Sequence, residues 1–439
     1  MDILIQASQF LLSLSFLIVL HEFGHFLPAK LFGMRVEKFY LFFDPWFSAV
    51  KKKIGDTEYG IGWVPLGGYV KISGMIDESM DKEQMSKPAE DWEFRSKPAW
   101  QRLIVMIGGV TVNVILGVLI YWGVLFTYGE TYLPAENAKY GVMVDSLGME
   151  LGLQNGDRIL ALDGALPEKF NSIPVNIVLN DTKVITVERD GQTIDLPMKE
   201  EILASLIKSR GFIAPRVPFD VSVVQKGSEA ETMGFEKGDK IIGINGEPIR
   251  YFDEFKAVVT GTIGESVTVK IDRAGQEMEM TGTVPESGML GMSNSGLTEE
   301  YFDIATKKYG FFESFPLGMK KAYATFDSYV KQMKLIFSPS TKAYESLGGF
   351  LTIGSIFSTT WDWHHFWNIT AFLSIVLAFM NILPIPALDG GHVMFTLYEM
   401  IFQRKPHEKF MEVAQYAGMI LLLSLLLFAN GNDIIRHFF

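Results

Sequence analysis

Residues 3–25 read ILIQASQFLLSLSFLIVLHEFGH, an apolar run that ends in two histidines and a glutamate. No charged side chain occurs before the first histidine, and the run has the length of a membrane-spanning helix. On a helix, the HExxH pattern places His21 and His25 on one face, where both imidazoles can reach a single zinc ion. Glu22 is then placed to take a proton from a water molecule at that zinc. This stretch therefore predicts a zinc hydrolase that works at membrane depth, because ionisable groups against a span are costly and functional by default.

The composition points to a mixed architecture. The chain has 439 residues, of which 48% are hydrophobic, and a mean hydropathy of +0.19. These values suit membrane spans combined with at least one water-soluble module. A net charge of −12 argues against nucleic acid as a partner. The chain has no cysteine, which excludes cysteine-protease chemistry, disulfides and thiolate ligands, so His, Asp or Glu must hold any metal.

Four apolar segments are long enough to cross a bilayer. They lie at about 3–27, 103–127, 366–388 and 413–428. The N-terminal Met1-Asp2 offers no positive region and no small-residue cleavage site follows, so we expect the first segment to remain as a span.

The polar region between the second and third segments repeats itself. GLQNGDRILALDG at 152–164 matches GFEKGDKIIGING at 234–246 with an offset of 82, and VERDGQ at 187–192 matches IDRAGQ at 271–276 with an offset of 84. A period near 80 residues predicts two copies of one small domain. The repeated string resembles PDZ domains, and more specifically so in the second copy. The resemblance implies binding of extended peptide by strand addition, and the alternative is a pair of solvated spacers.

Two further stretches suggest membrane contacts. Residues 301–337 interleave apolar and basic side chains at roughly helical spacing, which predicts an amphipathic helix lying on the membrane. Residues 361–367 read WDWHHFW and are typical of an aromatic belt at the entry to the third span. We therefore interpret His364 and His365 as interface anchors rather than metal ligands.

The strongest third-ligand candidate ends the third apolar segment, where residues 381–392 read NILPIPALDGGH. The two prolines break the helix, and Asp389 would be costly there without a cation. Two crossings separate Asp389 from His21 and His25, so all three lie on the same side of the membrane. Basic residues at 51–53, 404, 405 and 409 favour the cytoplasmic side for this site and the outside for the repeats.

These motifs together resemble the site-2 protease family of intramembrane zinc metalloproteases, over essentially the whole chain. The layout is closest to the bacterial regulator-of-sigma-E protease type. The resemblance implies one zinc ion per chain, held by His21, His25 and Asp389, with Glu22 as the catalytic base. It also implies that Asn381 contacts substrate.

One family motif is altered at the second span. The family pattern G-P-x-x-N reads GVTVN at 109–113, so the proline is missing. Asn113 keeps its place in the motif and remains a candidate substrate-binding residue.

A helical substrate hides its carbonyls in its own hydrogen bonds, so a membrane protease must unwind it. Residues 57–70 read TEYGIGWVPLGGYV and predict a β-hairpin, tolerated at membrane depth beside a cavity. We expect a free strand edge at Gly60, Ile61 and Gly62 to pair with the unwound substrate. The alternative is a structural loop that only covers the zinc.

The sequence thus predicts a polytopic α-helical membrane protein with four transmembrane helices, a membrane-associated β-hairpin and two β-rich PDZ domains. The expected boundaries are 1–28 for the first span with HExxH, 29–102 for the hairpin region, 103–128 for the second span, 129–208 and 209–297 for the PDZ domains, 298–345 for the amphipathic helix region, 346–392 for the third span with the LDG motif, and 393–439 for a cytoplasmic loop and the fourth span.

The predicted activity is cleavage of the transmembrane segment of a single-span membrane protein after a prior outside cut, in a bacterial inner membrane. An anti-sigma factor or a signal-peptide remnant is the substrate that the resemblance implies, and the lipid bilayer and peptide termini at the PDZ domains are the other partners. The alternative is a membrane-anchored PDZ adaptor with a non-catalytic metal site. The presence of Glu22 and all three ligands favours the enzyme.

Overall fold

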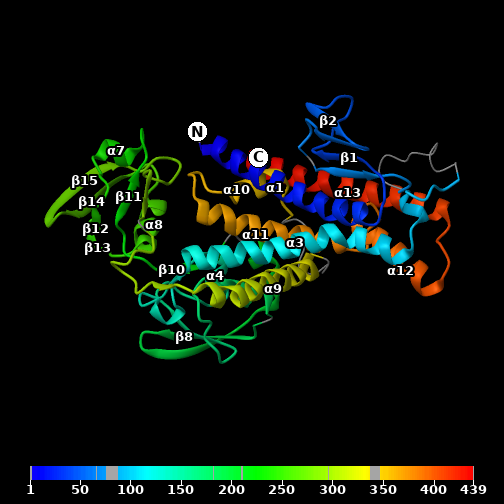
Figure 1. Ribbon diagram of the computed structural model, residues 1–439. Helices are drawn as coiled ribbons and strands as arrows, with labels where there is room; N and C mark the ends of the chain where they lie inside the picture. The colour runs from blue at the N-terminus through cyan, green and yellow to red at the C-terminus, as the bar shows by residue number, and fades with distance from the viewer. Residues whose placement is uncertain are drawn as a thin grey trace. The chain divides into compact units, whose positions relative to one another are not determined.

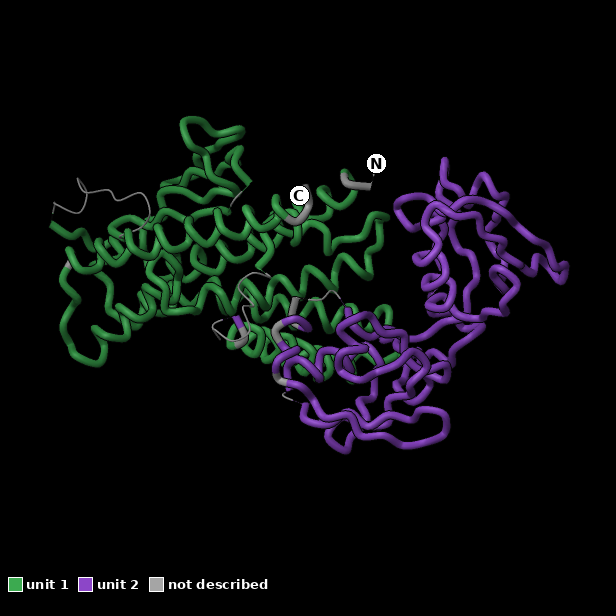
Figure 2. The backbone as a smooth tube through the Cα atoms, turned by 180° about the vertical axis from the view of Figure 1, so that it is seen from behind, with its two compact units in different colours: residues 1–129, 308–334, 344–439 green, residues 130–307, 335–343 purple. Residues whose placement is uncertain are grey.

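The computed structural model describes residues 2–65, 67–75, 88–180, 182–208, 211–294, 296–336 and 347–438. The chain divides into two compact units, shown in Figure 2. Unit 1 comprises residues 1–129, 308–334 and 344–439, and unit 2 consists mainly of residues 130–307. The predicted metal ligands all belong to unit 1, and the sequence repeat belongs to unit 2.

In the described part of unit 1, four helices are long and apolar enough to cross a membrane, as the apolar segments predict. They are α1 (Asp2–Leu31), α3 (Ala99–Tyr128), α11 (Trp363–Ile382) and α13 (Glu408–Phe438). Helix α3 packs against both α1 and α11 (Figure 1). The contact with α1 is very close, because a Cβ atom on Gly24 would lie 2.5 Å from the carbonyl oxygen of Gly108. Glycine at both positions therefore lets α3 lie directly against the HExxH segment.

The third span ends earlier than the sequence predicts. Helix α11 stops at Ile382, and a separate helix, α12 (Asp389–Phe402), begins at the aspartate of the LDG motif. The prolines at 384 and 386 explain the break, since neither can donate an i→i−4 hydrogen bond. A Cβ atom on Gly390 would lie 2.1 Å from the Leu383 carbonyl oxygen, so glycine allows α12 to start against the end of α11.

The segment between α1 and α3 forms a four-stranded sheet in the order β2-β3-β1-β4. The strands are β1 (Val36–Leu41), β2 (Val50–Ile54), β3 (Thr57–Ile61) and β4 (Tyr69–Ile72), and a short helix, η1 (Phe94–Ser96), follows. Strands β2 and β3 form a hairpin, β3 runs parallel to β1, and β4 pairs with the other side of β1.

The hairpin predicted at residues 57–70 is therefore wrong, because its two halves, β3 and β4, lie on opposite sides of β1. The free edge predicted at Gly60–Gly62 is wrong for the same reason, since Gly60 and Ile61 pair with both neighbouring strands. These glycines make room for packing instead. A Cβ atom on Gly60 would lie 2.3 Å from the Tyr40 ring, and one on Gly62 would lie 2.1 Å from the Phe43 carbonyl oxygen.

The predicted amphipathic helix is present as α9 (Phe311–Ile336), and α10 (Phe350–Ser355) follows it. Residues 337–345 of the predicted helix region lie outside the described residues. Helix α9 follows α11 lengthwise, because Lys321 contacts Asn368 and Tyr329 contacts Phe379. The position of this helix on the membrane surface stays a prediction. Its aromatic face finds partners on neighbouring helices rather than only in lipid.

Unit 2 contains two copies of a similar order of elements, which differ by helix α6 in the first copy and by the short strand β13 in the second. The first copy contains β6 (Val142–Val144), α4 (Ser146–Glu150), β7 (Arg158–Leu162), α5 (Ser172–Leu179), β8 (Val184–Arg189), β9 (Gln192–Pro197), α6 (Glu200–Lys208) and β10 (Ile213–Pro215). The second contains β11 (Val221–Val224), α7 (Glu229–Met233), β12 (Lys240–Ile244), β13 (Glu247–Pro248), α8 (Phe252–Gly261), β14 (Ser266–Arg273), β15 (Gln276–Thr283) and β16 (Met292–Asn294). Before and after them lie β5 (Glu130–Tyr132), η2 (Ala135–Asn137) and β17 (Ala305–Lys307).

The repeated sequence motif has the same structural role in both copies. Arg189 donates to the buried carboxylate of Asp157 and to the Gly152 carbonyl oxygen. Arg273 makes the equivalent contacts with Asp239 and the carbonyl of Gly234. The offsets of 82 and 84 between the two strings thus correspond to one arginine clamp that is built twice. Assignment of the copies as PDZ domains stays a prediction.

Candidate metal centre

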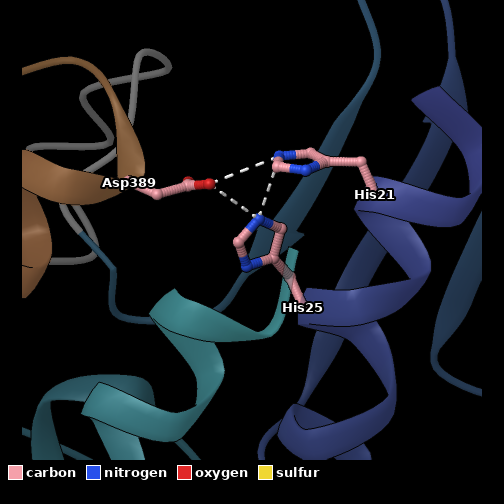
Figure 3. Close-up of side chains that lie close together, drawn as sticks. All are labelled: His21, His25 and Asp389. Carbon is pink, nitrogen blue, oxygen red and sulfur yellow. Dashed lines mark hydrogen bonds and ion pairs between the residues drawn. The ribbon is translucent and has the colours of Figure 1, made fainter. Parts of the chain in front are cut away.

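The two histidines of the HExxH motif lie one turn apart on α1 and are held from behind by α3. The Nδ1 atom of His25 lies 2.8 Å from the Val105 carbonyl oxygen. The Nδ1 atom of His21 lies 3.1 Å from the side-chain amide nitrogen of Asn113. Both Nδ1 atoms thus contact α3, and both Nε2 atoms face Asp389 (Figure 3).

The three predicted ligands meet in space. The Asp389 Oδ2 atom lies 3.3 Å from the Nε2 atoms of both His21 and His25, and the two Nε2 atoms lie 3.3 Å apart. Tetrahedral zinc with bonds of about 2.0 Å requires ligand atoms about 3.3 Å from one another. The Oδ2 atom is buried and accepts no hydrogen bond from the described residues. This geometry fits a metal ion with three protein ligands and one open position.

A stripe on α3 shapes the pocket around the histidines. Val105, Gly109 and Asn113 follow one another at intervals of four residues and so lie on one helix face. A Cβ atom on Gly109 would lie 2.4 Å from His25 Nε2 and 2.6 Å from His21 Cε1. Glycine at 109 therefore provides the space in which the imidazoles stand. The sequence identified Gly109 only as part of a family pattern and missed the role of Val105, since a backbone carbonyl leaves no trace in the sequence.

The site opens into a cavity of about 510 Å³. Glu22 lines this cavity together with His21, His25 and Asp389. Beside Glu22, a Cβ atom on Gly68 would lie 3.4 Å from the Glu22 Cγ and 2.5 Å from Ile18. The chain before β4 thus passes close over α1, and Glu22 sits between the metal-binding group and the β-sheet.

The two candidate asparagines both lie beside His21. The Asn381 amide nitrogen is 3.3 Å from His21 Nε2, which places it next to the metal-binding group. Asn113 is fully buried and is not among the residues that line the cavity. Its position therefore suits support of His21 better than direct contact with substrate. When His21 Nε2 faces a metal, Nδ1 carries the proton, so the Asn113 amide must turn to present its oxygen in place of its nitrogen. That oxygen is buried and has no partner among the described residues.

Among the described residues, the strand at the edge of the sheet beside the cavity is β4, not β3. Tyr69, Val70, Lys71 and Ile72 all line the cavity, and β4 is the outer strand of its sheet. This edge was missed in the sequence because the strand order depends on β1, which the sequence pattern did not identify as a strand.

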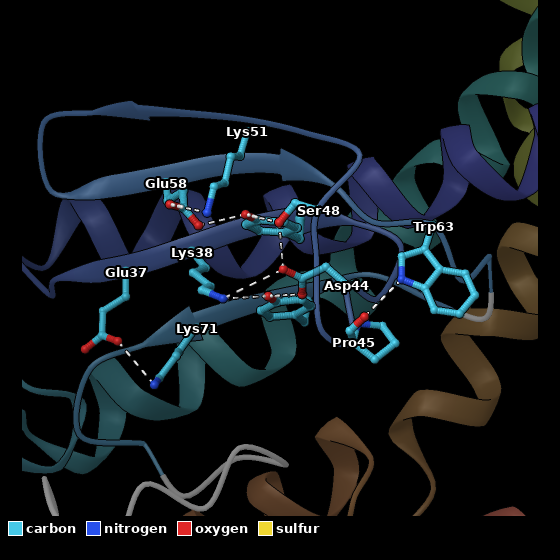
Figure 4. A network of polar contacts seen from close by, with 11 residues as sticks. Glu37, Lys38, Asp44, Pro45, Ser48, Lys51, Glu58, Trp63 and Lys71 are labelled. Carbon is cyan, nitrogen blue, oxygen red and sulfur yellow. Dashed lines mark hydrogen bonds and ion pairs between the residues drawn. The ribbon is translucent and has the colours of Figure 1, made fainter.

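A polar network fixes the loop after β1 against β4 (Figure 4). Asp44 accepts hydrogen bonds from Tyr69 at 2.7 Å and from Ser48 at 3.0 Å, and lies 3.9 Å from the Lys38 amine. The Trp63 indole donates to the Pro45 carbonyl oxygen at 3.0 Å. Burial and the hydrogen bond to Asp44 raise the pKa of Tyr69 far above its ordinary value, so Tyr69 stays protonated and remains a donor. The hydrogen bond from Tyr69 to Asp44 thus joins β4, which lines the cavity, to the loop after β1.

His364 and His365 lie at the other end of α11 from the metal-binding group. His364 packs against the Tyr128 ring at 4.8 Å, and His365 Nε2 lies 2.7 Å from the Ile356 carbonyl oxygen. Among the described residues, the only cluster suited to a metal ion is His21, His25 and Asp389.

The fold and the site define a class of protein. Beside four candidate spans, an HExxH motif on α1 and a distant aspartate at the start of α12 converge on one metal position, which is the arrangement of a membrane-embedded metallopeptidase. Comparison with known families agrees, because the chain matches peptidase family M50 over residues 9–425. The chain belongs to this family of site-2 proteases.

Curated relatives cover nearly the whole chain. A putative zinc metalloprotease of Vibrio cholerae is 28% identical over 99% of both chains. The regulator of sigma-E protease RseP of Escherichia coli is 28% identical over 98% of both chains. A putative zinc metalloprotease of Campylobacter jejuni is 27% identical over 97% of this chain and 92% of its own length. The protein is therefore a zinc metalloprotease, and its spans and relatives support a bacterial inner-membrane location.

Proposed function

We propose that this protease cleaves a single-span membrane protein inside its transmembrane segment, after a first cut on the outer side. His21, His25 and Asp389 hold the zinc ion, and Glu22 is the general base. The observation that carries the proposal is the triangle of ligand atoms with 3.3 Å sides, in a cavity that Glu22 also lines. Zinc supplies Lewis-acid polarisation of the scissile carbonyl and acidifies the attacking water.

Other residues of the chain transfer the proton, stabilise the developing negative charge and orient the histidines. Glu22 takes the proton of the attacking water and delivers it to the nitrogen of the leaving amide. The Asn381 amide, beside His21 Nε2, donates a hydrogen bond to the oxygen on which negative charge develops. The Val105 carbonyl keeps the proton of His25 on Nδ1, and the Asn113 amide, turned so that its oxygen replaces its nitrogen beside His21 Nδ1, does the same for His21.

The edge of β4 holds the substrate in extended form. An unwound substrate strand that pairs with β4 would lie along the cavity wall, with its scissile carbonyl near Asp389. This replaces the edge that the sequence suggested at Gly60–Gly62.

The orientation in the membrane, the role of unit 2 and the substrate are proposed from the resemblance and from the relatives. The metal site lies towards the cytoplasm, and the two copies in unit 2 are PDZ domains outside the membrane. They either bind a peptide terminus or act as a size filter that excludes substrates with bulky outer domains. An anti-sigma factor is the proposed substrate, since some relatives are regulator of sigma-E proteases, and a signal-peptide remnant is the other.

The deciding test is cleavage of a truncated single-span reporter by the full chain in membranes, with Glu22→Gln beside the native protein. Glutamine keeps the size of the side chain but cannot accept the proton, so we expect cleavage to fall by about 10²–10⁴-fold. Zinc content should remain at one ion per chain, because Glu22 is not a ligand. Glu286→Gln, at an exposed position in unit 2, is the matched control.

A chelator should abolish cleavage by the native chain. Zinc binding without cleavage of any single-span reporter would favour the adaptor with a non-catalytic metal site. Equal cleavage by the native chain and the Glu22 variant would remove Glu22 from the mechanism.

Strand addition at β4 is tested by proline, which removes a backbone donor. Backbone N–H groups of consecutive strand residues point to opposite sides of the strand, so one of Val70 and Lys71 directs its N–H away from β1. We expect the proline variant at that residue to lower cleavage while zinc is retained. Lys52→Pro on β2, the opposite edge of the same sheet, is the control and should cleave normally. Unchanged cleavage by both β4 variants would contradict substrate pairing at this edge.

A further inference from the structure

The loop that delivers Asp389 to the metal position is strained. Ala387, two residues before the ligand, has a φ of +80°. A residue with a Cβ atom adopts that region at a cost on the order of 1 kcal/mol or more, and keeps it only where its surroundings hold it. The conformation of this loop decides where the Asp389 carboxylate lies. Some contact must therefore stabilise Ala387 against relaxing to a conformation that carries Asp389 away.

Helix α13 provides such a contact. The Gln415 Oε1 atom accepts a hydrogen bond of 3.2 Å from the Ala387 N–H. Gln415 is only 4% exposed, although it lies in a helix of membrane-spanning length. An amide side chain inside a span is costly unless its polar atoms are bonded, so its burial against this loop calls for a specific role.

A second contact lies one turn further along α13. A Cβ atom on Gly418 would lie 1.7 Å from the Pro386 carbonyl oxygen, so that carbonyl rests directly on the α13 backbone. Gln415 and Gly418 stand three residues apart and share one helix face. We call this pair the α13 seat. One member binds the N–H of Ala387, and the other receives the carbonyl of Pro386.

The seat contrasts with the rest of α13. Only 11% of its most apolar stretch is buried within the protein, against 39% for α11. Gln415 also lines two cavities, the catalytic one and a neighbouring one of about 320 Å³, and His392 lines both as well. The seat thus lies where α13 reaches the metal site.

We propose that Gln415 and Gly418 are positioning residues for Asp389, so that the packing of α13 sets the zinc affinity of the site. The inference rests on the proposed function, in which Asp389 is a zinc ligand. Gln415 acts through Ala387 and does not touch the metal. A span that shifts away from the loop removes the acceptor from the Ala387 N–H and weakens the third ligand.

The test measures zinc affinity of the purified full chain by competition with a chelator. Gln415→Leu removes the acceptor and suits a membrane helix, and outer-shell losses of this kind weaken metal binding by about 10–100-fold. Gly418→Ala displaces the Pro386 carbonyl and should act in the same direction. Tyr416→Leu, next to the seat on the half-exposed side of α13, should leave the affinity unchanged.

Rescue separates positioning from general packing. Glycine adopts a φ of +80° without a Cβ penalty, so Ala387→Gly should recover a large part of the affinity that Gln415→Leu loses. Native affinity in Gln415→Leu, or a loss that Ala387→Gly leaves untouched, would overturn the inference. A native chain that bound no zinc would overturn the proposed function itself, and this inference with it.

Discussion

Helices α3 and α13 both support the metal site, but they do so very differently. Helix α3 meets both ligand histidines through Val105, Gly109 and Asn113, which are spaced four apart, and it also packs against α11. Helix α13 reaches the ligand loop through Gln415 and Gly418, and its apolar stretch has the smallest buried share of the four candidate spans.

The difference follows from what carries each ligand. His21 and His25 are parts of a regular helix, so a neighbouring helix needs only to fix their side chains. Asp389 starts a helix after a loop with two prolines and a strained alanine, so its backbone must be held as well. Two ligands are thus supported by a well-packed pair of helices, and the third depends on a span with little other burial.

The largest effect is expected on the α3 side, at Gly109. Gly109→Leu would place atoms where the imidazoles of His21 and His25 stand, because the three atoms nearest to a Cβ at this position all belong to these two rings. We expect zinc affinity to fall by at least about 100-fold, with cleavage lost in parallel. Gly123→Leu on the same helix meets open space and is the matched control. Zinc binding retained in the Gly109 variant would show that the histidines can be repositioned and are not fixed by α3.

A smaller effect is expected at Asn113, which supports one histidine only. Asn113→Leu removes the amide beside His21 Nδ1, and we expect zinc affinity to fall by about 10–100-fold. Asn113→Asp, which keeps an acceptor oxygen, should recover part of the loss. Thr111→Val alters an exposed hydroxyl that bonds its own helix and should change nothing. A raised KM with unchanged zinc affinity would instead support the substrate contact that the sequence suggested.

The sequence predicts the metal ligands better than the residues that hold them in place, because the ligand pattern is local and the holding contacts depend on packing. The HExxH spacing is local, and the even number of crossings places Asp389 beside it without knowledge of packing. The Val105 carbonyl has no sequence signal. The role of Gln415 appears only when α13 packs against the loop. Similarly, the edge at β4 depends on β1 entering between β3 and β4, a long-range pairing that no alternation in residues 57–70 encodes.

The smallest effect on zinc is expected at the other end of α13. Buried Asp433 accepts hydrogen bonds from the backbone and hydroxyl of Thr352 at the start of α10, and Asn430 accepts one from the Phe350 N–H. Asp433→Leu removes a helix-capping contact worth about 1 kcal/mol, so hydrogen exchange at the start of α10 should become faster. Gly431→Ala, which meets open space, is the control.

Zinc affinity should stay native in the Asp433 variant, because Asp433 lies about 22 Å along the helix from Gly418. A loss of affinity as large as that of Gln415→Leu would show that α13 supports Asp389 as one rigid rod, held at both ends. Native affinity with faster exchange in α10 would show that the support is local to Gln415 and Gly418. In that case the Asp433 end of α13 can move while the metal site stays assembled. A span beside a substrate-binding cavity needs this property if it moves to admit a substrate, because the zinc must stay bound during the movement.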